Sequence, residues 1–184
     1  MKRIILHWTG GAYAASKLDK KHYHFIVEGT GRVVHGDLPP EANETTSTVY
    51  AAHTRGLNTG SIGVAVAAMY GAVERPFNAG KYPITDRQVG AMVRLVADLC
   101  AQYDITVTPQ TVLTHAEVEG NLGVKQRGKW DTNWLPGMMQ AAYPTDAGDM
   151  LRQKIRDAQK PEKPQSPFAA IGKFFAALLK GAKK

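Results

Sequence analysis

The segment THAEVEGNLGVKQRGKWD, residues 114–131, carries His115 near its start and Asp131 at its end. The residues between them are polar and include glycines, which predicts a loop that presents side chains. Neutral imidazole and carboxylate groups are good ligands for a divalent ion such as Zn²⁺, and a catalytic zinc takes three protein ligands. The third ligand that we expect is His7, because it follows the apolar run at residues 4–6 and lies at the end of a predicted strand.

The composition is that of an ordinary globular protein, with 43% hydrophobic and 21% charged residues. A length of 184 residues suits one domain with a short additional segment. The single cysteine, Cys100, excludes an internal disulfide. The apolar run after Lys2 and Arg3 is too short for a signal peptide, so we expect synthesis in the cytoplasm without one.

The net charge of +7 is concentrated at the C-terminal end. Residues 160–184 contain six lysines and one acidic residue, whereas residues 1–159 contain 17 basic and 15 acidic residues. The main part of the chain is therefore close to neutral, and we expect no nucleic-acid partner.

Hydrophobic patterning predicts an α/β protein with a central mixed β-sheet flanked by helices. Strands are expected at residues 2–8, 22–27, 32–36, 61–69 and 112–114. A capping-box sequence at Thr85 opens a helix that extends to about Tyr103, with apolar residues at three- and four-residue steps. A second, more polar helix is expected at residues 146–159. The residues expected to face inward on it are Met150, Leu151, Ile155 and Ala158.

A charged, Pro-rich linker at residues 160–166 is predicted to separate a main domain, residues 1–159, from an amphipathic helix at residues 167–184. Apolar residues form one stripe of this helix, which is typical of a helix in a membrane interface. The residues expected to interact with a membrane are Phe168, Ile171, Lys173, Phe175, Leu178, Leu179 and Lys180. We expect lysines to attract anionic lipid or lipopolysaccharide. The alternative is a helix that docks on the main domain.

Short motifs follow one another along residues 1–145. They are His7-Trp8-Thr9, Tyr23-His24-Phe25, Ala52-His53-Thr54 with Asn58, Ser61-Ile62-Gly63, Thr114-His115 and Lys129-Trp130-Asp131. In this order they resemble the motifs of type-2 N-acetylmuramoyl-L-alanine amidases, a family that includes phage enzymes, bacterial recycling amidases and peptidoglycan recognition proteins. The resemblance implies a mixed sheet with helices on both faces and a zinc site in a groove.

The same resemblance implies one Zn²⁺ per chain, held by His7, His115 and Asp131. It also implies two catalytic residues, Lys129 and Tyr23. The reaction would be hydrolysis of the amide that joins N-acetylmuramic acid to L-alanine in peptidoglycan. Lys129 is expected to stabilise the oxyanion, and Tyr23 to orient water or donate a hydrogen bond to the oxyanion or the leaving amine.

Further residues in these motifs and in the loop after Asp131 are candidates for substrate binding. They are His24, His53, Trp8, Asn58 and Trp134. For the two histidines, a contact that orients a metal ligand and a purely structural role remain open, and for the tryptophans the alternative is core packing. Glu117 and Glu119 offer carboxylates close to His115, but their place in a predicted loop favours exposure.

Two departures from the family pattern distinguish this chain. Ala65 stands where recycling amidases carry a catalytic glutamate, which favours the phage-type arrangement with Tyr23 in place of the carboxylate. Residues 132–136, TNWLP, follow Asp131 where Pro-Gly-Pro is often found. We therefore expect the loop that frames the substrate to differ in shape.

The expected protein is a monomeric phage endolysin that is made in the host cytoplasm and acts on periplasmic peptidoglycan after release. One alternative is a cytoplasmic recycling amidase, against which Ala65 and the C-terminal segment count. A second is a non-catalytic peptidoglycan-binding module, which would not need the intact ligand set. A third is an antimicrobial protein whose membrane-active C-terminal segment is its whole function.

Overall fold

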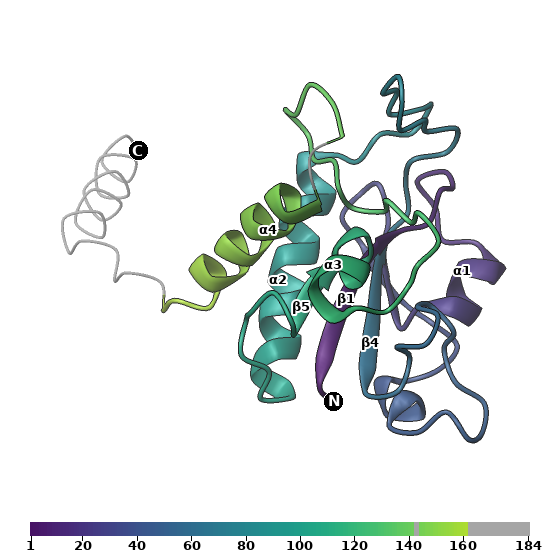
Figure 1. Cartoon of the computed structure of the whole chain (residues 1–184), viewed down its shortest axis with the longest axis vertical. Coiled ribbons are helices and arrows are strands. Elements are labelled where there is room, and N and C mark those ends of the chain that lie inside the picture. Colours follow the sequence, from purple (N-terminus) through teal and green to yellow (C-terminus); the bar gives the residue numbers. More distant parts are fainter. Residues whose placement is uncertain (142–143, 162–184) are drawn as a thin grey trace, which may run out of the picture.

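In the computed structural model, which describes residues 1–141 and 144–161, a five-stranded sheet has the order β3-β2-β4-β1-β5 (Figure 1). The strands are β1 (Arg3–Trp8), β2 (Phe25–Val27), β3 (Val33–His35), β4 (Ser61–Val66) and β5 (Val112–Thr114). β1 is parallel to β4 and β5, β2 is parallel to β4, and β3 is antiparallel to β2. The predicted mixed sheet is confirmed.

Helical segments connect and cover these strands. They are α1 (Lys17–His22), α2 (Asp86–Gln102), α3 (Val118–Leu122), α4 (Pro144–Ala158) and the 3₁₀ turns η1 (Pro40–Asn43) and η2 (His115–Glu117). The predicted capping box is present at the start of α2. Thr85 Oγ1 accepts the N–H of Gln88, and Gln88 Oε1 accepts the N–H of Thr85.

The two faces of the sheet bury different side chains, because successive residues of a strand point to opposite sides. On one face, Leu6 of β1 and Val64 of β4 belong to the large core that also contains residues of α2 and α4. On the other face, Ile5 packs in a smaller cluster with Val118 of α3. His7 follows Leu6, so alternation directs its side chain to the α3 face.

The strand predicted at residues 22–27 starts three residues later, at Phe25. His22 is instead the last residue of helix α1. The hydrophobic pattern did not reveal this helix, because none of the residues of α1 is buried. This short helix begins at a capping box between Ser16 and Asp19, whose side chains accept each other's backbone N–H.

Two other segments differ from the prediction. The strand expected at residues 61–69 ends at Val66. The segment between His115 and Asp131, for which the sequence predicts a loop throughout, begins with η2 and α3. Helix α3 is capped at its C-terminal end by Gly123, which has φ of +70°. A left-handed glycine is a common helix terminator because it has no Cβ.

The inward face of α4 also differs from the prediction. Leu151 and Ile155 are buried as expected, whereas Met150 is 44% exposed and Ala158 is exposed. Next to Leu151 the chain buries Arg152, which is only 2% exposed. Apolar periodicity could not reveal this position, because a buried cation depends on a partner from another element.

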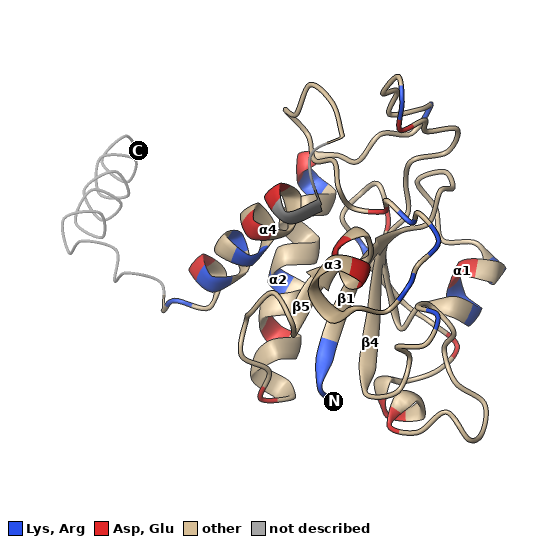
Figure 2. Ribbon diagram, viewed as in Figure 1, with Lys and Arg blue, Asp and Glu red and all other residues tan. Residues whose placement is uncertain are grey.

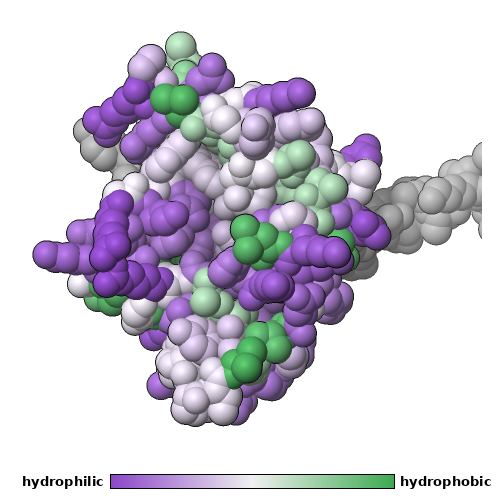
Figure 3. Space-filling model, turned by 90° about the vertical axis from the view of Figure 1, so that its right-hand side faces the viewer, coloured by the Kyte–Doolittle hydropathy of each residue, from purple (hydrophilic) through white to green (hydrophobic). Residues whose placement is uncertain are grey.

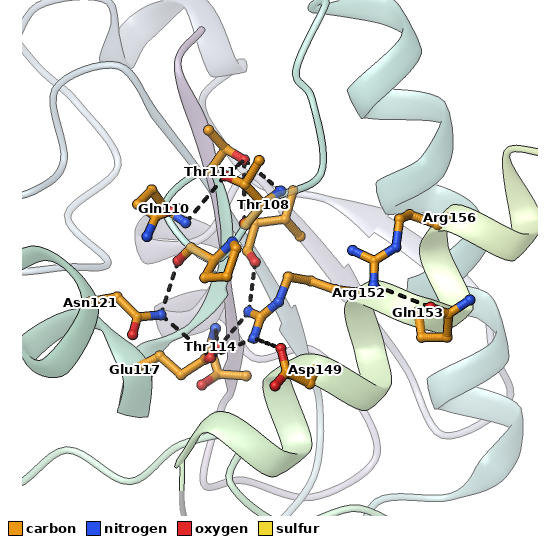
Figure 4. A network of polar contacts seen from close by, with 12 residues as sticks. Thr108, Gln110, Thr111, Thr114, Glu117, Asn121, Asp149, Arg152, Gln153 and Arg156 are labelled. Atoms are coloured by element: carbon orange, nitrogen blue, oxygen red, sulfur yellow. Dashed lines mark hydrogen bonds and ion pairs between the residues drawn. The ribbon is translucent and has the colours of Figure 1, made fainter.

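Arg152 anchors α4 to the turn that carries His115 (Figure 4). Its guanidinium donates to both carboxylate oxygens of Glu117, at 3.0 and 2.8 Å, and to Asp149 Oδ1 at 2.7 Å. Glu117 Oε2 also accepts the backbone N–H of Thr114 at 2.9 Å. Glu117 is 1% exposed, so the expectation of an exposed carboxylate is wrong. The network fixes the first turn of η2.

The C-terminal elements expected from the sequence lie outside the described residues. These are most of the linker, residues 162–166, and the helix at residues 167–184 with its membrane-interacting side chains. Among the helices that the structure does describe, none has both the length and the apolar character needed to cross a membrane.

We predict that Arg152→Met lowers the free energy of unfolding by about 3–5 kcal/mol, because it leaves the buried Glu117 carboxylate without its partner. Urea unfolding followed by circular dichroism measures the change. Arg156→Met is the matched control, since Arg156 lies on the same helix and is exposed, and we expect it to cost less than about 0.5 kcal/mol. Equal losses in the two variants would contradict the anchoring role.

Candidate metal centre

Three elements bring three potential metal ligands to one point. His7 is in β1, His115 opens η2 directly after β5, and Asp131 lies in the loop that follows α3. Because β1 and β5 are neighbouring parallel strands, their C-terminal ends meet at the same edge of the sheet. The ligating atoms of the three buried residues all lie within 4.8 Å of one another. The structure thus brings together the three residues that the sequence suggested as metal ligands.

The carboxylate of Asp131 lies between the two histidines. Its Oδ2 is 3.1 Å from His7 Nδ1 and 2.8 Å from His115 Nδ1. Burial lowers the pKa of His7 to about 4. A carboxylate and neutral imidazoles are the forms that bind a metal ion.

The turn at His53 and Thr54 contacts His7 at Nε2, the ring nitrogen that faces away from Asp131. His7 Nε2 lies 3.3 Å from His53 Nδ1 and 3.4 Å from Thr54 Oγ1. His53 Nε2 is 3.3 Å from the carbonyl oxygen of Ser61, which can only accept, so His53 carries its proton on Nε2. His7 therefore donates from Nε2, and its Nδ1 lone pair points at Asp131. His53 thus contacts the ring of His7, which is the contact that an orienting role requires.

This donor set fits a divalent metal ion. Nδ1 of His7 and a carboxylate oxygen of Asp131 are both acceptors, and two acceptors at 3.1 Å repel each other unless a cation lies between them. Nitrogen and oxygen donors of this kind suit Zn²⁺, and three protein ligands leave a position open for catalysis.

Two further polar side chains border the cluster. The ring centroid of Tyr23 is 5.1 Å from that of His7. Burial, and then the negative charges of Asp131 and Asp19, raise the pKa of Tyr23 above its ordinary value, so its phenol stays protonated. Lys129 is exposed, and its positive charge contributes to the lowered pKa of His7.

A groove of about 1140 Å³ is lined partly by residues that adjoin His115 and Asp131 in the sequence. One wall is formed by residues 74–77, and another by Ala116, Lys129, Trp130 and Asn133, which flank the ligands in the sequence. On the face shown in Figure 3, hydrophobic side chains are scattered among hydrophilic ones and form no single patch. The groove is large enough for an extended polar ligand.

Positive charges lie on the loop that follows α3 (Figure 2). Lys125, Arg127 and Lys129 are exposed there, and the exposed Arg55 is adjacent, since its carbonyl oxygen accepts a hydrogen bond from Gln126. The ion pairs found among the described residues involve none of these four cations. They are available to attract anionic groups of a ligand.

Two of the predicted substrate-binding residues have structural partners. Asn58 Oδ1 accepts the backbone N–H groups of His53 and Thr54 at 3.1 and 2.8 Å, which fixes the turn behind His7. His24 is 1% exposed, and its Nδ1 accepts the N–H of Gly63 at 2.9 Å.

The predicted tryptophan walls require a correction. Trp8 lies on the α2 face of β1, opposite to His7, and belongs to the large core. Trp134 is also in this core and packs against Phe77, with ring centroids 5.3 Å apart. The tryptophan that lines the groove is Trp130, which stacks edge-on against Trp8 at 4.7 Å.

Ala65 lies on the same face of the sheet as His7, because the two residues are partners in the pairing of β1 with β4. Its side chain is fully buried. A longer side chain here would point toward the ligand cluster, so alanine leaves this position without a carboxylate. Tyr23 is one of the polar groups beside His7.

Sequence reasoning missed Gln126, whose Oε1 is 2.9 Å from His115 Nε2. A metal-bound histidine usually has a partner on its second nitrogen, so a partner could have been expected. The segment offers several candidates, including Glu117, Glu119 and Asn121, and the sequence does not distinguish among them.

Comparison with known proteins gives one family match and several structural likenesses. A family model described as N-acetylmuramoyl-L-alanine amidase matches residues 1–136. The amidase LysC from Clostridium intestinale URNW has a TM-score of 0.50 at 17% identity, with 84% of this chain and 85% of that chain covered. No curated protein sequence matches the chain.

Two other solved structures match the chain at lower TM-scores. The Ph2119 endolysin, from a bacteriophage of Thermus scotoductus MAT2119, has a TM-score of 0.47 at 18% identity, covering 83% of this chain and 82% of that one. The E. coli amidase AmiD, in complex with an anhydro-muropeptide substrate, has a TM-score of 0.46 at 24% identity, covering 64% and 49%. At 17% identity, the likeness to LysC concerns the fold alone.

Proposed function

The chain belongs to the N-acetylmuramoyl-L-alanine amidase family, and we propose that it is a zinc-dependent hydrolase of peptidoglycan. The bond cleaved is the amide between N-acetylmuramic acid and L-alanine. The observation that carries this proposal is the buried convergence of His7, His115 and Asp131. A peptidoglycan-binding module would need the groove but not three ligands held with their donor atoms facing one point.

One Zn²⁺ would be held by Nδ1 of His7, Nδ1 of His115 and Oδ2 of Asp131. A bound zinc ion supplies a Lewis acid that polarises a carbonyl group and lowers the pKa of water. The protein contributes the fixed orientation of the ligands. His53 and Thr54 hold the His7 ring, and the Arg152–Glu117 ion pair holds the turn at His115.

We assign Lys129 and Tyr23 to stabilisation of the reacting groups. Lys129 places a cation on the wall of the groove beside the ligands, where it can stabilise negative charge on the carbonyl oxygen, an effect worth about 3–4 kcal/mol for one donor. Tyr23 is kept protonated by burial and nearby negative charge, and so acts as a hydrogen-bond donor. Its acceptor is the oxyanion or the leaving amine.

The substrate is peptidoglycan, whose peptides carry free carboxylates. The exposed cations Arg55, Lys125 and Arg127 around the ligand cluster suit such a substrate. Within the family, Ala65 favours a phage endolysin over a recycling amidase because no carboxylate stands beside His7 on β4. Such an enzyme is made in the host cytoplasm and reaches peptidoglycan after release.

We further propose, from the sequence, that residues 167–184 bind anionic membrane or lipopolysaccharide. The apolar stripe supplies the buried surface, and the lysines supply attraction of about 1 kcal/mol each near an anionic surface. This role is separate from hydrolysis, so removal of residues 160–184 is expected to leave activity on purified peptidoglycan intact.

We predict that the protein binds about one Zn²⁺ per chain and releases new N-terminal L-alanine from purified peptidoglycan without new reducing sugar. Asp131→Ala removes an anionic ligand and is expected to abolish both zinc binding and activity. Elemental analysis and end-group assays measure the two quantities. Asp98→Ala, at an exposed position of α2, is the control. A wild-type protein that binds peptidoglycan without metal or cleavage would favour the recognition module.

Substitution of the two proposed catalytic residues is predicted to lower kcat while zinc content stays at the wild-type level. We expect a loss of about 10²–10³-fold for Lys129→Met and of about 10²-fold for Tyr23→Phe. Lys154→Met removes an exposed cation on α4, and its kcat is expected to stay within about twofold of the wild-type value. Steady-state kinetics on a soluble muropeptide separate the effects. A raised KM with unchanged kcat would show binding roles instead.

For the C-terminal segment, we predict that Phe175→Glu combined with Leu178→Glu abolishes binding to vesicles containing anionic lipid, because both charges fall on the apolar stripe. Vesicle co-sedimentation gives the bound fraction. Gln165→Glu with Ser166→Glu adds the same charge in the linker and controls for electrostatics. Unchanged binding by the stripe variant would rule out the membrane role.

A further inference from the structure

We propose that Gln126 is a positioning residue that holds His115 in its metal-binding tautomer, an inference that rests on the metal centre proposed above. Gln126 is 5% exposed and lies in the loop between α3 and Asp131. Its Oε1 is 2.9 Å from Nε2 of His115, on the side of the ring that faces away from Asp131.

The orientation of the Gln126 amide is determined by its other contacts. Its Nε2 donates to the carbonyl oxygen of Arg55 at 3.0 Å and to that of Val124 at 3.1 Å. Both partners are acceptors, so they fix the NH₂ group on their side and the amide oxygen on the side of His115. The reversed amide would place an oxygen against two carbonyl oxygens.

The amide orientation in turn determines where His115 carries its proton. An amide oxygen can only accept a hydrogen bond, so His115 must donate from Nε2. The neutral ring then has its lone pair on Nδ1, the atom that lies 2.8 Å from Asp131 Oδ2. A metal ion at the cluster requires that lone pair. Gln126 thus keeps His115 ready for coordination.

Gln126 is itself held firmly. Its backbone N–H donates to Glu119 Oε2 at 3.1 Å, which ties the loop to α3. Through the Arg55 carbonyl its side chain also joins this loop to the segment after His53 and Thr54, which hold His7. Both His7 and His115 therefore have a hydrogen-bond acceptor at Nε2, the ring nitrogen that faces away from Asp131. Gln126 provides this acceptor for His115.

A purely structural role for Gln126 is the competing explanation, because its NH₂ group also bridges two backbone segments. The two roles use different atoms. The bridge requires the NH₂ donors, whereas positioning of His115 requires the oxygen acceptor. Gln126→Met removes both, and Gln126→Glu removes the donors but keeps an oxygen that faces His115.

The test measures the zinc affinity of the full-length chain by competition with a chromophoric chelator, together with urea unfolding of the metal-free protein. We expect Gln126→Met to bind zinc about 10–100-fold more weakly than wild type. Gln126→Glu should lose folding stability yet bind zinc more tightly than Gln126→Met. Gln88→Met is the matched control, because Gln88 is fully buried on α2, on the face of the sheet opposite to His7, and its Nε2 donates to the carbonyls of Val27 and Ala67.

Long-range ¹H–¹⁵N correlation spectra of the zinc-loaded protein provide a direct readout. They should show the His115 proton on Nε2 in the wild type. A proton on Nδ1, wild-type zinc affinity in Gln126→Met, or equal weakening in Gln126→Met and Gln126→Glu would each overturn the inference. A wild-type chain that binds no zinc would overturn the proposed metal centre itself, an outcome distinct from the other three.

Discussion

The structure depends on one electrostatic constraint, the burial of the Asp131 carboxylate against Nδ1 of both His7 and His115. These are acceptor atoms, and in a buried site their mutual repulsion is not screened by water. A cation at their centre turns the repulsion into attraction. The rest of the fold holds the three groups in place, and the contacts around them serve that purpose.

Those contacts come from parts of the chain that are far apart. The turn at His53 and Thr54 holds the His7 ring, and Gln126 holds the His115 ring. Beneath them the buried Arg152–Glu117 pair ties α4 to η2 (Figure 4). Each of these contacts involves a buried polar group whose partner lies on another element. The positions of His7, His115 and Asp131 therefore depend on contacts between distant segments rather than on local structure.

The fold separates packing from chemistry by the two faces of the sheet. Alternation along β1 directs Leu6 and Trp8 into the core beneath α2, and directs His7 to the opposite face. Ala65 lies next to His7 on β4, and its small side chain leaves Tyr23 as the protonated group beside the ligand.

The sequence by itself determined the mixed sheet, the capped helix at Thr85 and the identity of the clustered residues His7, His115 and Asp131, because these follow from local periodicity, capping and motif order. Only the tertiary structure decided which side chains surround them. It buried Trp8 and Trp134, which had been expected in the groove, and placed Gln126 behind His115. It also buried Arg152 with Glu117. The physical reason is that burial of a polar group, and the face on which a side chain lies, depend on partners distant in the chain.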